Sequence, residues 1–204
     1  SQHAAGRERQ NPLMPSSRRA SNGGMSTEKR RGDWLQTFTG RQFWPLDPRP
    51  EEVDILDIAH ALSQQCRFAG HTRVFYSVAE HCVRVSLACD PKDALAGLLH
   101  DAAEAYVVDV PRPLKRHLPD YRAIEAVVHH AIATRFWTPD VLPVSVQHAD
   151  NVLLATEARD LMSRPTNAWA PMPLPLDEWI SPWSSALAKE RFLARFADLG
   201  GTAL

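Results

Sequence analysis

The hydrophobic residues of this chain recur at three- and four-residue steps over most of its length, which is the spacing of one helix face. The stretch EEVDILDIAHALSQQCRF at 51–68 illustrates this pattern. The same spacing predicts five further helices, over 77–90, 93–108, 121–137, from Pro143 through Met162, and 184–198. We therefore expect an all-α bundle of about six helices.

Two segments depart from helical spacing. Residues 34–50, WLQTFTGRQFWPLDPRP, are aromatic and proline-rich around a central Thr-Gly, which is typical of a short hairpin or an extended segment. Residues 163–183 contain five prolines and three tryptophans. Proline excludes regular helix there, and the aromatic content indicates a loop that packs on the body.

The charge is distributed unevenly, although the net charge is only -1. Residues 1–32 carry seven Lys or Arg against two Glu, are rich in Ser, Gly, Asn and Arg, and have few large apolar residues. This composition is typical of a disordered basic arm, and no nucleic-acid polymer is expected as a partner. Residues 33–204 are net acidic and are long enough to form one domain.

Composition also limits the cellular setting. No apolar run approaches the ~20 residues of a membrane span, so no membrane partner is expected. The three cysteines, Cys66, Cys82 and Cys89, form no CxxC pair, which disfavours a disulfide framework or a cysteine zinc site. A reducing, cytoplasmic location is therefore predicted.

Ionisable residues gather where core-like segments end. His100 and Asp101 follow apolar residues in GLLHDAAEAYVVDVPRPLK at 97–115, while His81 and Asp150 lie on apolar stripes of two other predicted helices. A buried carboxylate needs a partner, and imidazole with carboxylate suits Zn, Mn or Co. Singly, His81 also fits a satisfied core histidine, and Asp150 fits a helix cap or a salt-bridge partner.

These residues resemble a known family. The order H…HD…D, with SVAEH ending in His81 and LLHDAAEAYVVDVPRPLK around His100-Asp101, is similar to the HD-domain metal-dependent phosphohydrolases. Within that family, the bacterial 5'-deoxynucleotidases and the phage deoxynucleoside triphosphate hydrolases carry HD-x-x-E followed by D-[LV]-P-x-P-[LV]-K. The resemblance covers about residues 51–162. The ppGpp-hydrolase branch instead has an adjacent Glu-Asp pair, whereas here Glu104 precedes Ala105.

The resemblance implies an HD-domain helical bundle and a ligand set for one divalent ion, with Zn, Mn or Co expected and Mg or Fe as alternatives. The implied metal ligands are His81, His100, Asp101 and Asp150. It further implies that Glu104 and Asp109 act on the attacking water and the leaving oxygen, without deciding which is acid and which is base. The alternative interpretation makes Glu104 a solvated helix residue and Asp109 a cap before Pro111.

Four residues are the main candidates for substrate binding, and a fifth is a weaker one. Lys115 follows the rigid VPRPL segment and is expected to meet phosphate, with Arg112 as a weaker candidate. Arg67 and Phe68 match an Arg-aromatic pair that contacts phosphate or sugar and lines the pocket in the related nucleotidases. This chain has Phe where they have Trp, at a slightly shorter spacing. His71 fits either a substrate contact or a loop cap.

The function expected from the resemblance is a metal-dependent nucleotide phosphohydrolase, foremost a 5'-deoxynucleotidase acting on deoxynucleoside monophosphates. The alternatives are a deoxynucleoside triphosphate triphosphohydrolase and a non-catalytic sensor that binds metal and nucleotide. A homo-oligomer, dimer or larger, is also expected, with residues 34–44 and 165–183 as candidate contact surfaces.

Overall fold

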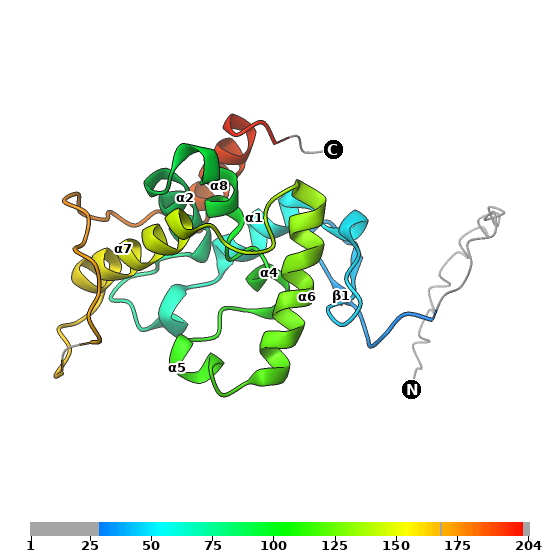
Figure 1. Ribbon diagram of the computed structural model, residues 1–204, viewed down its shortest axis with the longest axis horizontal. Helices are drawn as coiled ribbons and strands as arrows, with labels where there is room; N and C mark the ends of the chain where they lie inside the picture. The colour runs from blue at the N-terminus through cyan, green and yellow to red at the C-terminus, as the bar shows by residue number, and fades with distance from the viewer. Residues whose placement is uncertain (1–28, 168, 202–204) are drawn as a thin grey trace, which may run out of the picture.

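The computed structural model describes residues 29–167 and 169–201. Over these ranges the regular secondary structure is almost all helix, apart from one two-stranded hairpin, which confirms the prediction of an all-α fold. The longer helices are α1 (Ile55–Gln64), α2 (Val78–Ala88), α3 (Ala94–Leu99), α6 (Pro119–Phe136), α7 (Val144–Leu161) and α8 (Ser185–Asp198). Two single-turn helices, α4 (Glu104–Val107) and α5 (Arg112–Lys115), lie between α7 and α6 (Figure 1). Three 3₁₀ turns complete the helical elements: η1 (Pro50–Glu52), η2 (Arg67–Gly70) and η3 (Pro91–Asp93).

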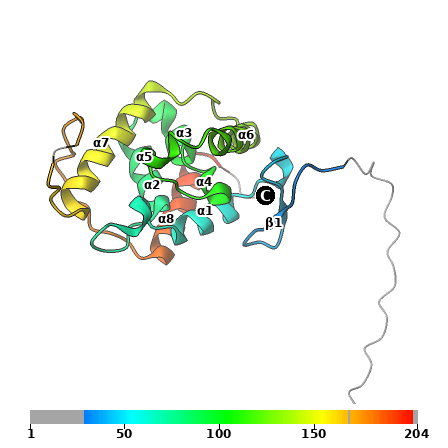
Figure 2. The same cartoon turned by 90° about the horizontal axis from the view of Figure 1, so that it is seen from below.

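The aromatic segment near the N-terminus forms the expected hairpin. Strand β1 (Leu35–Gln36) pairs antiparallel with β2 (Gln42–Phe43). The Phe43 ring is fully buried and stacks on Tyr106, with 3.7 Å between ring centroids. The hairpin turn is tied to α1, because the backbone N–H of Thr39 donates to Asp57 Oδ1 at 2.7 Å. In both views the hairpin lies beside α6, away from α7 (Figure 2).

The expected boundary between arm and body needs a correction. Residues 1–28 of the predicted disordered arm lie outside the described residues. Arg30 was assigned to the arm, yet its guanidinium donates to Asp47 Oδ2 at 2.6 Å and to Glu52 Oε1 at 2.5 Å. The packed body therefore includes Arg30, because both acceptors lie in the segment that connects the hairpin to α1.

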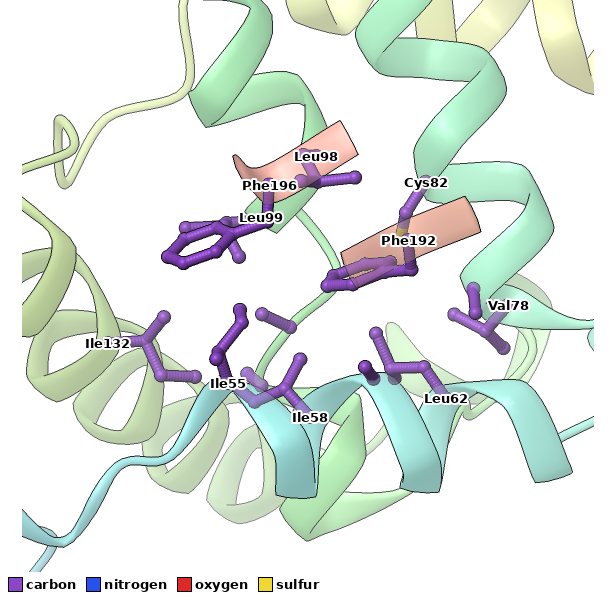
Figure 3. Packing of buried hydrophobic residues seen from close by; sticks show 14 of the residues in the cluster. Ile55, Ile58, Leu62, Val78, Cys82, Leu98, Leu99, Ile132, Phe192 and Phe196 are labelled. Atoms are coloured by element: carbon purple, nitrogen blue, oxygen red, sulfur yellow. The ribbon is translucent and has the colours of Figure 1, made fainter. Parts of the chain in front are cut away.

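The main core forms where the last long helix packs against the first. Phe192 and Phe196 of α8 lie over Ile55, Ile58 and Leu62 of α1, and all five side chains are buried (Figure 3). Helices α2 and α3 close the same cluster. The two ends of the chain's helical body are thus joined by apolar burial, which is the main favourable term in folding.

The range 93–108 was predicted as one helix, and this prediction is wrong. The chain forms α3, tightens through a turn at residues 100–103, and continues as α4. In that turn the N–H of Ala102 bonds to the carbonyl of Leu99, and the N–H of Glu104 bonds to that of Asp101, both at 3.0 Å. These three-residue steps belong to a 3₁₀ arrangement, which hydrophobic periodicity over a short window does not distinguish from an α-helix.

The proline-rich segment after α7 contains no helix or strand in its described residues, as predicted. It packs on α7: the Arg159 guanidinium donates to the carbonyl oxygens of Leu176 at 2.6 Å and Glu178 at 2.9 Å. The N–H of Ile180 donates to Asp160 Oδ2 at 2.9 Å.

No helix in the described ranges has the length and apolar composition required to cross a lipid bilayer.

Candidate metal centre

Side chains from three separate parts of the chain meet next to α4. His81 lies on α2, His100 and Asp101 lie on the tight turn after α3, and Asp150 lies on α7. The Nε2 atoms of His81 and His100 are 3.2 Å apart. His81 Nε2 is 3.2 Å from Asp150 Oδ1 and 3.7 Å from Asp101 Oδ2, and His100 Nε2 is 3.2 Å from Asp101 Oδ2. All four residues that the sequence suggested as ligands therefore converge.

The hydrogen bonds of the two imidazoles determine which nitrogen faces the cluster. His81 Nδ1 is 2.6 Å from Glu157 Oε1, and His100 Nδ1 is 2.8 Å from the carbonyl oxygen of Gly97. Each acceptor favours a proton on Nδ1, which leaves the Nε2 lone pairs directed at the same small space. Two lone pairs at this separation repel each other unless a cation or a proton lies between them. The hydrogen bonds from Glu157 and Gly97 therefore orient the two imidazoles in a way that fits a metal ion.

The set of donor atoms agrees with that fit. Two imidazole nitrogens and two carboxylate oxygens suit Zn, Mn or Co, and Asp101 and Asp150 also line an open cavity. Cys82 is an alternative ligand, because its sulfur lies within 4.8 Å of the ligand atoms of His100 and Asp101. Burial raises the pKa of the Cys82 thiol, so burial opposes the thiolate form that metals bind.

Protons and a cation compete for these side chains. Burial lowers the pKa of His100, but Asp101 outweighs it and raises that pKa well above its ordinary value. Burial likewise opposes ionisation of Asp101, yet His100, His81 and Arg67 hold its pKa below its ordinary value. The pKa of Asp150 is lowered in the same way against burial, chiefly by His81. Metal binding to these groups would release protons, so we expect metal affinity to rise with pH.

Glu157 is a residue that the sequence analysis did not identify. Its side chain is fully buried on α7, where Oε1 lies 2.6 Å from His81 Nδ1 and Oε2 accepts from Arg67 Nε at 3.2 Å. Burial opposes the charge on Glu157, but Arg67 and then His81 keep its pKa below its ordinary value. One carboxylate thus orients a metal ligand and a cation together. The sequence feature that could have identified Glu157 is its position seven residues after Asp150, which is two turns along the same helix face.

Arg67 lies beside the cluster. Its guanidinium is buried, with Nη1 3.5 Å from Asp101 Oδ2 and Nη2 3.2 Å from Glu157 Oε2. Phe68 follows it in the chain, and its ring lies 5.3 Å from the Arg67 guanidinium carbon. Arg67 therefore contacts a candidate metal ligand and Phe68 lies next to Arg67, both within the 3₁₀ turn η2 that precedes α2.

Glu104 and Asp109 flank the ligands on the side of α4. Glu104 is 4% exposed, and among the described residues its Oε2 has no hydrogen-bond partner. Burial, followed by the charges of Asp101 and Asp109, raises the pKa of Glu104 well above its ordinary value. Burial also raises the pKa of Asp109, against the opposing effect of Arg67. Burial thus raises the pKa of both carboxyls beside the candidate ligands, and it does so more strongly for Glu104 than for Asp109.

Gln65 is a second residue that sequence reasoning missed. It follows α1, donates from Nε2 to the carbonyl of Glu104 at 3.0 Å, and accepts at Oε1 from the N–H of Asp109 at 3.1 Å. The amide thereby fixes the backbone at both candidate acid-base residues. Nothing in the spacing of residue types marks a glutamine for this role.

The other two candidate cations are engaged in ion pairs. Lys115 pairs with Glu125 of α6 and lies 3.8 Å from Glu104 Oε1. Arg112 pairs with Asp150 through the carboxylate oxygen that does not face His81, and its Nη1 donates to Asn151 at 3.2 Å. Arg112, which the sequence favoured less, thus contacts a candidate metal ligand directly.

A cavity of about 790 Å³ opens onto the cluster. Every residue that the sequence singled out for the site lines it, except the two ligand histidines, which are buried. Its charged lining includes Arg67, Asp101, Glu104, Asp109, Arg112, Lys115, Arg116 and Asp150. Its apolar lining includes Phe68, Leu154, Met162, Trp169, Pro171 and Met172. His71 also lines the cavity, and it is exposed to solvent.

Comparison with known proteins places the chain in a family. No protein-family model matches it. It is 39% identical over 169 residues to the uncharacterized protein YfdR of Escherichia coli K12, an alignment that covers 81% of this chain and 95% of YfdR. It is also 33% identical over 136 residues to the uncharacterized protein RCAP_rcc00048 of Rhodobacter capsulatus, covering 62% of this chain and 69% of that protein. The identity to YfdR and the coverage of nearly all of its length show that the chain belongs to the family of Escherichia coli YfdR.

Proposed function

We propose that this protein is a metal-dependent phosphohydrolase that removes phosphate from deoxynucleoside monophosphates. The observation that carries the proposal is the convergence of His81, His100, Asp101 and Asp150 at a cavity that also holds cationic side chains. A divalent ion held by this set would acidify water and polarise a phosphoryl oxygen. The resemblance of the HD-x-x-E and D-V-P-x-P-L-K motifs to the HD-domain nucleotidases supports the same reaction class.

The phosphate is proposed to lie against Arg67. Its guanidinium is already oriented by Glu157, so little side-chain freedom is lost when an anion binds. A planar guanidinium with several N–H groups can also hold two phosphate oxygens at once. Lys115, fixed by Glu125 beside Glu104, adds positive charge where the leaving oxygen departs.

Glu104 and Asp109 are proposed to divide the proton transfers. Glu104 has a raised pKa and an unpaired buried oxygen within the described residues; both favour its protonated form, so Glu104 is the proposed proton donor. Asp109 then accepts a proton from the attacking water. The P–O bond to the 5'-oxygen breaks, the leaving oxygen takes the proton of Glu104, and the water oxygen becomes part of the released phosphate.

The proposal is tested with the purified chain stripped of metal and reloaded with Zn, Mn or Co. We expect inorganic phosphate to be released from deoxynucleoside monophosphates only after reloading, and release to stop on chelation. Phosphate release that does not depend on metal would contradict the proposed site. Metal-dependent binding of nucleotide without any turnover would instead support the non-catalytic sensor.

A second candidate is release of tripolyphosphate from deoxynucleoside triphosphates. The observation that favours it is the pair of further cations, Arg112 and Arg116, that line the same cavity. Chromatography of the products separates the two reactions, because tripolyphosphate and inorganic phosphate elute differently. We expect inorganic phosphate from the monophosphates to dominate, since Arg112 is already paired with Asp150.

A further inference from the structure

The cavity has an apolar end that the metal chemistry does not use. Phe68, Met162, Trp169 and Met172 line it together with the cations. Trp169 is 40% exposed and Met172 is 37% exposed. Apolar side chains that remain open to solvent beside a few convergent polar groups are typical of a site that binds a small organic molecule.

Two of these side chains are aromatic and face the same space. The ring centroids of Phe68 and Trp169 are 6.5 Å apart, and their planes are inclined by 46°. A flat ring held between two others needs about 7 Å between them, twice the ~3.5 Å contact distance of carbon atoms. The centroid separation is therefore close to that needed for one planar ring, and a rotation of 46° would make the two ring planes parallel.

The backbone that presents Phe68 is strained. Phe68 and Ala69 adopt φ values of 55° and 51°, which costs free energy for residues other than glycine. The turn is held in place by a bond from the Arg67 N–H to the Tyr76 carbonyl at 2.9 Å and by one from the His71 N–H to the Phe68 carbonyl at 3.0 Å. Strained backbone is found where a site requires it. Here the strain keeps an aromatic ring next to a cation.

The opposite wall is held by the helix that carries Asp150. The segment that bears Trp169 leaves α7 after Leu161 and returns to it where the Leu176 N–H donates to Thr156 Oγ1 at 2.9 Å. Pro171 and Pro175 restrict the backbone between these points. Such a wall loses little conformational freedom when a ligand binds against it.

From this geometry we infer that Phe68 and Trp169 form a slot for a nucleobase, so that the segment after α7 determines which phosphate esters bind. The cations hold the anionic end of the ligand, and the slot holds its flat apolar end. The inference rests on the proposed function, because it names the part of the substrate that lies away from the metal ligands. Every base can stack on aromatic side chains. We therefore expect ligands that carry a base to bind more tightly than ligands without one, with only a weak preference among the bases.

Calorimetric titration of the metal-loaded protein tests the slot, with Glu104→Gln present in every sample, the otherwise wild-type protein included, so that the proposed substrate is not hydrolysed during the titration. The two ligands are a deoxynucleoside monophosphate and deoxyribose 5-phosphate, which has the same anionic end and no base. We expect wild-type protein to bind the nucleotide at least about tenfold more tightly, and Phe68→Ala or Trp169→Ala to abolish most of that difference. Binding of deoxyribose 5-phosphate should change less than twofold in either variant.

Two further variants serve as controls. Trp179 lies on the same segment but does not line the cavity, is 71% exposed, and contacts the Arg159 guanidinium at 4.6 Å from its ring. Trp179→Ala should bind both ligands as the wild type does. Trp169→Phe should restore most of the nucleotide binding that Trp169→Ala loses, since it keeps an aromatic face.

The outcomes separate the slot from the hydrolysis. Equal affinity of wild-type protein for the two ligands, or equal weakening of both by Trp169→Ala, would overturn the slot, whereas metal-dependent phosphate release would still support the hydrolase. A base-dependent affinity that Trp169→Ala removes, in a protein that releases phosphate from neither compound, would support the slot and overturn the proposed hydrolysis. Absence of binding by both ligands would overturn the slot as well.

Discussion

The two ends of the cavity are built differently. At the metal end most of the charged side chains are buried and paired: His81 and Arg67 share Glu157, and His100 contacts the carbonyl of Gly97. Glu104 is the exception, because its buried Oε2 has no hydrogen-bond partner among the described residues. At the aromatic end Trp169 is partly exposed, on a segment that leaves and rejoins α7. One end is specified by hydrogen bonds and charge, the other by shape and apolar surface.

The difference follows from the cost of burying each kind of group. A buried charge without a partner is strongly destabilising, so a buried ionisable residue at the metal end either has a second residue to hold its charge or, like Glu104, has a pKa shifted toward its neutral form. An aromatic ring on a surface segment has no such requirement. Substitutions at the metal end should therefore affect both the fold and the chemistry, whereas substitutions at the aromatic end should affect binding alone.

The largest effect is expected for Asp101→Ala. Removing this carboxylate takes away a candidate metal ligand and a partner of Arg67. A metal ion supplies several kcal/mol of transition-state stabilisation, so kcat/KM for phosphate release should fall by about a thousandfold or more. Elemental analysis should show metal loss. Asp140→Ala, at an exposed carboxylate that pairs with His130, is the matched control and should keep both metal and activity.

Glu104→Gln should have the next largest effect on activity. We expect kcat to be lower by about 10²- to 10⁴-fold and the metal content to be unchanged. The pKa of Glu104 is raised, so the protonated form is present below that pKa and is lost as the pH rises through it. Wild-type kcat/KM should therefore fall on the alkaline side. That fall should be absent in the variant, whose amide does not titrate. A variant as active as the wild type would remove Glu104 from the mechanism.

Glu157→Gln should weaken metal binding, although the side chain at this position contacts His81 and not the metal site itself. Losing the carboxylate behind His81 is expected to lower metal affinity by about 10- to 100-fold, as measured by competition with a metal indicator. Unfolding in urea should show a loss on the order of 1–3 kcal/mol, because Arg67 keeps a buried charge with one acceptor fewer. Glu190→Gln, at an exposed position of α8, should leave both quantities unchanged. Unaltered metal affinity in Glu157→Gln would contradict the role of Glu157 in orienting His81 for metal binding.

The smallest change in stability is expected for Trp169→Ala. Its side chain lies on a surface segment, so the free energy of unfolding should shift by no more than about 0.5 kcal/mol. Phe192→Ala, which empties a fully buried position of the core, should cost about 3–5 kcal/mol in the same assay. A comparable loss in the two variants would mean that the aromatic end is part of the core after all.

Much of this architecture could be predicted from residue order. The residue pattern located α1, α2, α6, α7 and α8, and the amphipathic period behind such a prediction is clear in α1, α2 and α8. The division of 93–108 into α3 and α4 could not be predicted in this way, since a 3₁₀ turn preserves apolar spacing over a few residues. Gln65 and Glu157 were missed for a different reason: their roles depend on which backbone or ring lies opposite them.

By itself, the sequence determined the helical class, the proline-rich segment and the residue types able to bind a metal, because these depend on local periodicity and side-chain chemistry. Only the tertiary structure decided that His81, His100, Asp101 and Asp150 meet, and that Arg112 and Lys115 are held in ion pairs. Such contacts join residues far apart along the chain. They arise because α2 and α3 pack with α6 in one apolar cluster and with α7 in a second, an arrangement that no single segment encodes.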